Sequence, residues 1–193
     1  MNTALTSLDL SGNNFDDQSI TCLGTMLREN KVLTSLRLSS CGLGPKALQT
    51  VCRAVGMNTT LTSLDLSFSK FDDQSITCLG TVLKYNKVLT SLVLVGCGLG
   101  PEGLCEVCNA FGMNTTLTSL HLSGNEFDDQ SIACLGTMLR ENKVLTTLGL
   151  NRCGLGPEGL CEVCNAVRMN TTRTYIDLSE NRFDDKSITC LGK

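Results

Sequence analysis

The sequence predicts an α/β solenoid, a stack of repeated strand-and-helix units that share one parallel sheet. Three observations carry this prediction. The same residue pattern returns every 28 positions along the 193 residues. Within each unit the spacing of apolar residues changes from the period of a strand to the period of a helix. Residues typical of helix starts and helix exits flank the helical part of each unit.

The units come in two alternating versions, so the full period is 56 residues. A units contain a Phe-Asp-Asp segment, as in LTSLDLSGNNFDDQSI, and B units contain Cys-Gly-Leu-Gly-Pro, as in LTSLRLSSCGLGPKAL. A units begin at positions 5, 61, 117 and 173, and B units begin at positions 33, 89 and 145. We therefore expect one repeat domain over residues 1–193, with about seven units, the last of them incomplete.

Each unit opens with a predicted strand. Leu8 and Leu10 of the first unit lie two residues apart, so both side chains point to one buried face. The third, fifth and seventh residues of the unit then point to the opposite face, with the eighth residue alongside. Because a helix must return the chain before the next strand, the strands are predicted to be parallel.

The second half of each unit is predicted to be an amphipathic helix. In the first unit Ile20, Leu23, Gly24 and Leu27 have the spacing of one helical stripe. A single unit cannot bury this stripe alone, so neighbouring units must stack to cover it.

Helix starts and exits are marked in every unit. In the first A unit Asp16 is a plausible N-cap, and Asp17 lies in the first turn, where the helix dipole favours a negative charge. B units place Gly-Pro at this point, as in Gly44-Pro45, with proline as the first helical residue. Each helix is expected to exit at an asparagine, a residue that tolerates the left-handed conformation. These asparagines are Asn30, Asn58, Asn86, Asn114, Asn142 and Asn170.

Composition excludes several classes of function. The net charge is only −3, which leaves no basic surface for nucleic acid or for an anionic membrane. No run of eighteen apolar residues is present, so we expect no membrane span. Met1 leads directly into a repeat without the pattern of a signal peptide, which favours a cytoplasmic protein.

The twelve cysteines follow the repeat. Equivalent cysteines recur every second unit, roughly 20 Å apart if adjacent helices pack about 10 Å apart, which exceeds the reach of a disulfide. Free thiols and a reducing, cytoplasmic compartment are therefore expected. The pairs Cys105-x-x-Cys108 and Cys161-x-x-Cys164 have a zinc-like spacing but cannot converge, so no metal and no cofactor is predicted. Cys105 and Cys161 lie at the helix flank, where we expect sensitivity to oxidation.

The pattern LxxLxLxx(N/C)x(L/F), followed by a helix and Asn-x-x-Leu, strongly resembles the ribonuclease-inhibitor-like class of leucine-rich repeats. It is also similar to the C-terminal repeats of nucleotide-binding innate immune receptors. The residues of the first unit that carry the resemblance are Leu5, Leu8, Leu10, Asn13, Phe15, Ile20, Leu23, Leu27 and Asn30. The resemblance implies a right-handed, horseshoe-shaped solenoid with a concave parallel sheet, convex helices and protein recognition on the concave face. It implies no catalysis.

The chain departs from that pattern in two units. Ser69 stands where Asn13 and Asn125 stand, so one turn loses an amide side chain. Arg173 replaces the leading leucine of the last unit, and Tyr175 follows it. No P-loop motif is present, so the chain is not a complete nucleotide-binding receptor.

The differences between copies point to a binding surface. The helical segment GLCEVCNA is identical in two B units, whereas the fifth, seventh and eighth residues of the unit differ in all three. Exposed apolar residues at such positions are typical of interfaces. The predicted protein-binding residues are Asp9, Arg37, Asp65, Phe68, Val93, Val95, His121, Asn151, Arg152, Tyr175 and Asp177.

Three functions fit these observations. The first is a non-enzymatic scaffold that captures a partner protein, in which His121, the only histidine, is a surface contact. The second is a regulator of a GTPase, similar to the leucine-rich Ran GTPase-activating proteins. The third is a structural module that associates end to end, because the terminal units expose apolar cross-sections and unpaired strand edges.

Overall fold

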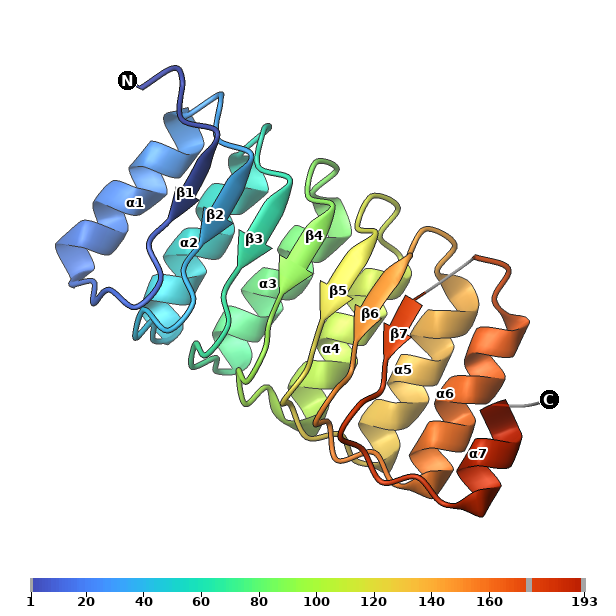
Figure 1. Cartoon of the computed structure of the whole chain (residues 1–193). Coiled ribbons are helices and arrows are strands. Elements are labelled where there is room, and N and C mark those ends of the chain that lie inside the picture. Colours follow the sequence, from blue (N-terminus) through green and yellow to red (C-terminus); the bar gives the residue numbers. More distant parts are fainter. Residues whose placement is uncertain (1, 173–174, 192–193) are drawn as a thin grey trace.

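The computed structural model describes residues 2–172 and 175–191, and strands alternate with helices throughout this part of the chain (Figure 1). The strands are β1 (Ser7–Asp9), β2 (Ser35–Arg37), β3 (Ser63–Asp65), β4 (Ser91–Val93), β5 (Ser119–His121), β6 (Thr147–Gly149) and β7 (Tyr175–Asp177). The helices are α1 (Asp17–Glu29), α2 (Pro45–Met57), α3 (Asp73–Tyr85), α4 (Gly100–Gly112), α5 (Asp129–Glu141), α6 (Pro157–Met169) and α7 (Asp185–Leu191). Arg173 lies outside the described residues.

The seven strands form one parallel sheet in sequence order. Each residue pairs with the residue 28 positions later, so that Leu8 pairs with Leu36 and Leu36 with Leu64. Equivalent residues of successive units therefore lie in straight lateral rows across the sheet. The predicted solenoid of parallel strands is confirmed.

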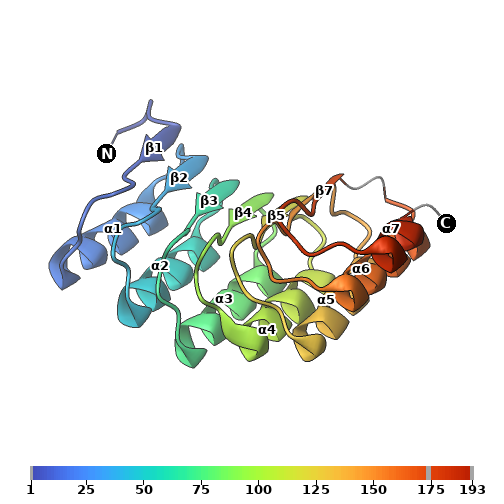
Figure 2. The same cartoon turned by 60° about the horizontal axis from the view of Figure 1, so that its bottom comes forward.

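The core lies between two layers, the sheet and the helices, which Figure 2 shows from the side. Leu36, Leu64, Leu92, Leu120 and Leu148 are at most 1% exposed. In α1 the buried residues are the predicted stripe of Ile20, Leu23, Gly24 and Leu27. Strands pack about 4.8 Å apart and helices about 10 Å apart, which bends the stack with the sheet on its concave side.

Helix starts follow the prediction in both kinds of unit. The carboxylate of Asp16 accepts a hydrogen bond from the Ser19 N–H at 2.8 Å, as expected of an N-cap. In α2 and α6 a glycine precedes the helix and proline is its first residue. α4 begins one residue earlier, at Gly100, so that Pro101 is its second residue.

Helices α1, α2, α3, α5 and α6 exit at the predicted asparagines, but the left-handed conformation predicted for these residues is wrong. α4 ends one residue earlier, at Gly112, and its exit residue is Met113. Asn30 and Asn142 have extended backbones, with φ −69° and ψ 132° and 130° respectively. The side-chain amide explains the choice of residue. The Asn142 oxygen accepts hydrogen bonds from the N–H groups of Val144 and Leu145, and its nitrogen donates to the Phe111 carbonyl of the preceding unit at 3.0 Å. The same link to the preceding unit is made by Asn58, Asn86, Asn114 and Asn170, and Asn30 of the first unit accepts hydrogen bonds from the N–H groups of Val32 and Leu33. These asparagines therefore turn the chain into the next strand, and those after the first unit also tie neighbouring units together.

The turn after β3 confirms the predicted loss of an amide. In the corresponding turn Asn125 accepts hydrogen bonds from the N–H groups of Cys97 and Leu99 and donates to the carbonyls of Leu94 and Leu122. Ser69 is equally buried, at 2% exposure, but its hydroxyl has no hydrogen-bond partner among the described residues. Buried polar groups usually have a hydrogen-bond partner, so this turn carries an unsatisfied hydroxyl in the part of the interior that the structure describes.

One cysteine prediction is wrong. Cys105 of α4 and Cys134 of α5 form a disulfide, with Cα atoms 5.3 Å apart. Equivalent cysteines are indeed too distant to pair, but these two occupy different positions in adjacent helices, which the repeat brings together. The bond involves one of the two cysteines for which oxidation sensitivity was predicted. It also removes the ground for inferring a reducing compartment from the cysteines.

Within residues 2–172 and 175–191, none of the helices has the length and apolar character needed to cross a membrane.

Candidate protein-binding surface

The sheet register gathers the predicted residues on the concave face. The fifth residues of the units form one row, in which each member pairs with the next across the strands. In order the row is Asp9, Arg37, Asp65, Val93, His121, Gly149 and Asp177. Val95 and Asn151 follow two residues later, in the turns after β4 and β6, and Phe68 and Arg152 lie at the eighth position of their units. Sequence reasoning thus placed all eleven predicted residues on the strands or the turns after them.

Two aromatic side chains protrude from this face. Phe68 is 57% exposed and Tyr175, on the last strand, is 68% exposed. Val93 and Val95 are half-buried, so the prediction that they are exposed is wrong. Neighbouring strands of a sheet lie about 4.8 Å apart, so side chains on the same face of adjacent strands shield one another.

Phe68 occupies a backbone conformation that its side chain disfavours. The eighth residue has a positive φ in every unit, and glycine fills this position in the first, fourth and fifth units, for example Gly96 with φ 60°. Phe68 has φ 59°. A left-handed backbone costs a residue with a side chain roughly 1–2 kcal/mol relative to its usual conformation. A bulky aromatic group is therefore held exposed at a position that favours glycine.

The Phe68 ring rests on the next unit, at Gly96. A Cβ atom added to Gly96 would lie 2.7 Å from a ring carbon of Phe68, well inside van der Waals contact. The missing side chain of Gly96 thus leaves the space that the ring occupies, and the ring is fixed on the concave edge rather than free in solvent.

Charged groups lie on the N-terminal side of this apolar centre. The Arg37 guanidinium is 3.7 Å from the Asp9 carboxylate, and both side chains are more than half exposed. Hydrogen bonds from the Ser11 hydroxyl and N–H are the main cause that lowers the pKa of Asp9, and the Arg37 charge adds to the effect. Asp65 is the partner of Arg37 on the next strand, β3. This end of the face therefore carries both signs of charge.

On the C-terminal side, the His121 ring lies close to Gly149, its partner on the next strand. A Cβ atom added to Gly149 would lie 2.6 Å from Nδ1 of His121, so glycine makes room for the ring. Hydrogen bonds from Ser179 lower the pKa of Asp177, and the nearby charge of His121 lowers it further. His121 and Asp177 thus interact electrostatically across Gly149.

An ion pair extends this side of the surface. Nε of Arg152 is 2.5 Å from the Glu180 carboxylate of the next unit, and both side chains are more than half exposed. Glu180 is absent from the predicted residues, although it occupies the same eighth position as Phe68 and Arg152. Its position in the repeat was the signal that could have identified it.

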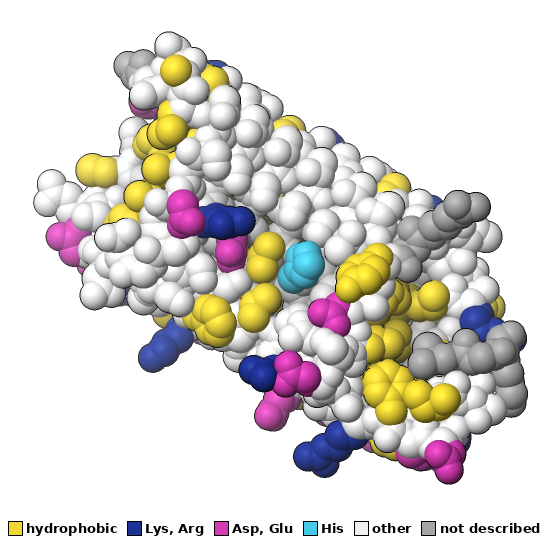
Figure 3. All heavy atoms as spheres, viewed as in Figure 1, with side chains coloured by type: hydrophobic (Ala, Val, Ile, Leu, Met, Phe, Trp, Pro, Cys, Tyr) yellow, Lys and Arg dark blue, Asp and Glu magenta, His cyan; other side chains and the backbone are white. Residues whose placement is uncertain are grey.

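The assembled face has an apolar centre between charged groups. Figure 3 shows hydrophobic side chains beside the single histidine, with acidic and basic side chains on both sides of them. Such a pattern of aromatic anchors with a polar rim is typical of protein interfaces.

Within residues 2–172 and 175–191, one serine–histidine contact on this surface resembles part of a catalytic site. Ser119 Oγ lies 3.3 Å from Nε2 of His121. The same serine recurs at Ser7, Ser35, Ser63 and Ser91, so it belongs to the repeat rather than to a special site. Among the described residues no group of three or more His, Cys, Asp or Glu side chains is placed to hold a metal ion.

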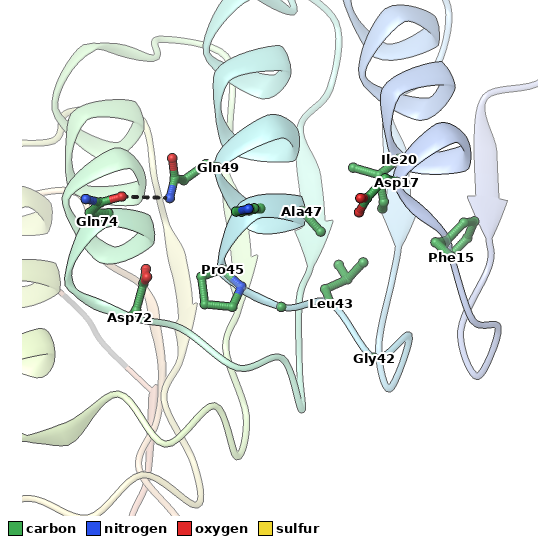
Figure 4. A pocket seen from close by; sticks show the side chains of 12 residues that line it. Phe15, Asp17, Ile20, Gly42, Leu43, Pro45, Ala47, Gln49, Asp72 and Gln74 are labelled. Atoms are coloured by element: carbon green, nitrogen blue, oxygen red, sulfur yellow. Dashed lines mark hydrogen bonds between the residues drawn. The ribbon is translucent and has the colours of Figure 1, made fainter.

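A cavity of about 520 Å³ lies elsewhere, near the starts of α1, α2 and α3 (Figure 4). Its lining includes Asp17, Pro45, Gln49, Asp72 and Gln74, and Gln49 donates a hydrogen bond to Gln74 at 3.4 Å. The Asp72 carboxylate accepts hydrogen bonds from Ser75 as a helix cap. The paired aspartates of the A units thus serve helix starts.

Comparison with known proteins identifies the family. The model of the family described as Leucine Rich repeat matches residues 2–24, 29–52, 58–80, 85–108, 114–136 and 141–164, which is more than half of the chain. The chain is a leucine-rich repeat protein. The ribonuclease-inhibitor-like subtype is a finer assignment that this match does not make.

One curated relative of this leucine-rich repeat protein matches a short stretch of it. Leucine-rich repeat-containing protein 34 of Mus musculus is 34% identical over 58 residues, which are 30% of this chain and 14% of the mouse protein. The chain therefore matches only a small part of that curated relative.

Solved structures share the fold. The tropomodulin C-terminal domain of Caenorhabditis elegans superposes with a TM-score of 0.63 at 14% identity, over 78% of this chain and 92% of the domain. Leiomodin-1 actin-binding site 2 gives a TM-score of 0.57 at 18% identity, over 70% and 82%. An internalin of Listeria monocytogenes gives 0.50 at 20% identity, over 98% and 59%.

Proposed function

We propose that this leucine-rich repeat protein is a non-enzymatic scaffold that binds a partner protein through its concave face. The observation that carries the proposal is Phe68, which is exposed at a left-handed position where three other units have glycine. Strained residues persist where the surrounding structure holds them and function retains them. A fixed, exposed aromatic ring loses little entropy on binding, which makes it an effective anchor.

The rest of the face supports the same function. Val93 and Val95 extend the apolar area beside Phe68, and Tyr175 supplies a second aromatic side chain with a hydroxyl. The flanking charges, Asp9 with Arg37 and Arg152 with Glu180, form a polar rim that would select and orient the partner. We propose that residues 1–193 act together as one binding domain in the cytoplasm, as expected from the sequence.

The kind of partner is a finer proposal. The resemblance to ribonuclease-inhibitor-like repeats and immune-receptor repeats favours recognition of another folded protein, in the manner of an inhibitor or a receptor. One of the solved structures that share the fold is leiomodin-1 actin-binding site 2, so actin is a second partner to include in binding assays.

The test is capture of partners from an extract of native cells by the wild-type protein and two triple variants. Replacing Phe68, Val93 and Tyr175 with alanine should reduce capture at least about 30-fold, the equivalent of losing roughly 2 kcal/mol of binding energy. In the matched control variant, alanine replaces Met57, Tyr85 and Met113, which are exposed at the helix ends.

The control variant should capture partners as the wild type does, because it removes exposed apolar groups away from the sheet. Circular dichroism checks that both variants remain folded. Equal capture by all three proteins would contradict the proposal, and so would equal loss in both variants. A measurement of GTP hydrolysis by the captured partner, with and without this chain, tests the alternative of a GTPase regulator.

A further inference from the structure

The helix layer contains a second pair of cysteines equivalent to the disulfide. Cys161 of α6 and Cys190 of α7 lie 56 positions after Cys105 and Cys134, so both pairs are 29 residues apart. Each pair joins the helix of a B unit to the helix of the A unit that follows it. In the structure Cys161 and Cys190 are both free thiols.

The two pairs have the same surroundings. The Cys105 sulfur lies 3.7 Å from the Gln130 carbonyl oxygen, and the Cys161 sulfur lies 3.8 Å from the Lys186 carbonyl oxygen, 56 positions later. The Cys161 thiol donates a hydrogen bond to the Cys190 sulfur, which together with burial raises the pKa of Cys161 to about 11. Cys161 and Cys190 therefore stand at the same positions of two adjacent helices as the bonded pair.

We propose that Cys161 and Cys190 form an oxidative cross-link that fastens α7 to α6. Such a bond forms where cysteines occupy these two positions of the repeat in adjacent helices, and the Cys105–Cys134 disulfide between α4 and α5 is the first example. α7 packs against α6 alone among the described helices. A bond at this interface therefore fixes a helix that has a neighbour on one side only.

The oxidant is a low-molecular-weight disulfide, for which oxidised glutathione is the probe. Cys190 is half-buried and Cys161 is buried, so Cys190 reacts first. Its thiolate attacks one glutathione sulfur, forms a mixed disulfide and releases one glutathione thiolate. The Cys161 thiolate then attacks the Cys190 sulfur and releases the second. Two protein thiols are oxidised, one glutathione disulfide is reduced to two thiols, and the two protein protons pass to the released thiolates.

The α2–α3 interface supplies a matched control. Cys78 of α3 is equivalent to Cys134 and Cys190, but Gln49 of α2 stands where Cys105 and Cys161 stand. The Cys78 sulfur lies 3.8 Å from the Gln49 carbonyl oxygen, so the two positions face each other here as well. Gln49 lines the cavity of Figure 4, where its side chain reaches Gln74 on α3.

The experiment treats the full chain with oxidised glutathione, alkylates the remaining thiols and maps the cross-links by mass spectrometry of a non-reduced digest. We expect the Cys161–Cys190 peptide pair beside Cys105–Cys134, and a fall from ten alkylated thiols to eight. Cys161→Gln, which copies the residue of the first B unit, should remove this cross-link alone. Gln49→Cys should gain a new cross-link to Cys78.

Three outcomes would overturn the proposal. The first is that Cys190 is still a free thiol, and is therefore alkylated, after oxidation of protein that contains the Cys105–Cys134 bond. The second is a cross-link from Cys190 to Cys164 instead of Cys161. The third is a folded Gln49→Cys variant, verified by circular dichroism, that gains no bond to Cys78, because the position rule would then fail. Hydrogen exchange in α7, slower in the oxidised than in the reduced protein, would support the fastening of the helix.

Discussion

At the scale of single residues, glycine and its replacements decide the shape of the concave edge. Gly96 and Gly149 leave room for the rings of Phe68 and His121 from the preceding units. Phe68 itself stands where glycine would be unstrained. The position of each of these two rings thus depends on a glycine in the next unit, because any side chain at that glycine would collide with the ring.

Replacing Phe68 with glycine should separate binding from stability. Relief of the left-handed strain gives roughly 1 kcal/mol or more, and the backbone entropy of glycine costs about 0.5–1 kcal/mol, so the two nearly cancel. We expect the free energy of unfolding, measured by urea titration, to stay within about 1 kcal/mol of wild type. Partner capture should fall at least about 30-fold. A Phe68→Gly variant that captures its partner as the wild type does would remove Phe68 from the interface.

Replacing Ser69 with asparagine should stabilise the protein. The amide would reach the N–H groups of Cys41 and Leu43 and the Leu38 carbonyl, by analogy with Asn125 one full period later. Satisfying buried groups of this kind contributes about 1–3 kcal/mol. The matched control is Asn125→Ser, which should destabilise by a similar amount. A lower urea midpoint for Ser69→Asn would show that this turn does not accept the amide.

At the scale of elements, the helix starts and exits are set by particular residues of the repeat. An aspartate or a Gly-Pro pair starts the helix, and an asparagine amide links its exit to the preceding unit. In Asp72, Asp128 and Asp184, hydrogen bonds from the N–H and hydroxyl of the serine three residues later lower the pKa of the carboxylate. The charged form of each cap is therefore favoured by folding.

These caps predict a loss of stability in acid. Because their pKa values are lower in the folded chain than the ordinary 3.8, the stabilisation is present above that pH and is lost as pH falls through the folded values. The melting temperature should therefore decline below about pH 4. A variant with asparagine at all three positions keeps a cap that does not titrate and should decline less. Parallel declines for the two proteins would contradict this assignment.

The elements also show what the sequence can and cannot predict. The 28-residue spacing predicted the strands, the helix stripes and the caps, because these depend on local periodicity. The extended conformation of Asn30 was missed, because the rule for helix exits does not describe an amide oxygen that accepts hydrogen bonds from the N–H groups two and three residues later. The Cys105–Cys134 bond was missed, because only equivalent positions were compared. The partial burial of Val93 depends on flanking strands, which periodicity within one unit does not describe.

At the scale of the whole molecule, the fold turns a row of variable residues into one continuous surface. Parallel pairing in register places residues 28 positions apart side by side, so a change in any unit alters the same face. Each helix packs only against its sequence neighbours, which keeps the surface open along its length. Binding by this face is the central claim.

Hydroxyl-radical footprinting of the chain with its captured partner tests that claim most directly. Exposed aromatic and sulfur-containing side chains report on both sides of the molecule: Phe68 and Tyr175 on the sheet, and Met57, Tyr85, Met113 and Met169 at the helix ends. The account predicts that the partner protects Phe68 and Tyr175 from oxidation and leaves the helix-end residues as reactive as in the free chain. Protection of the helix-end residues, with Phe68 and Tyr175 still reactive, would contradict it.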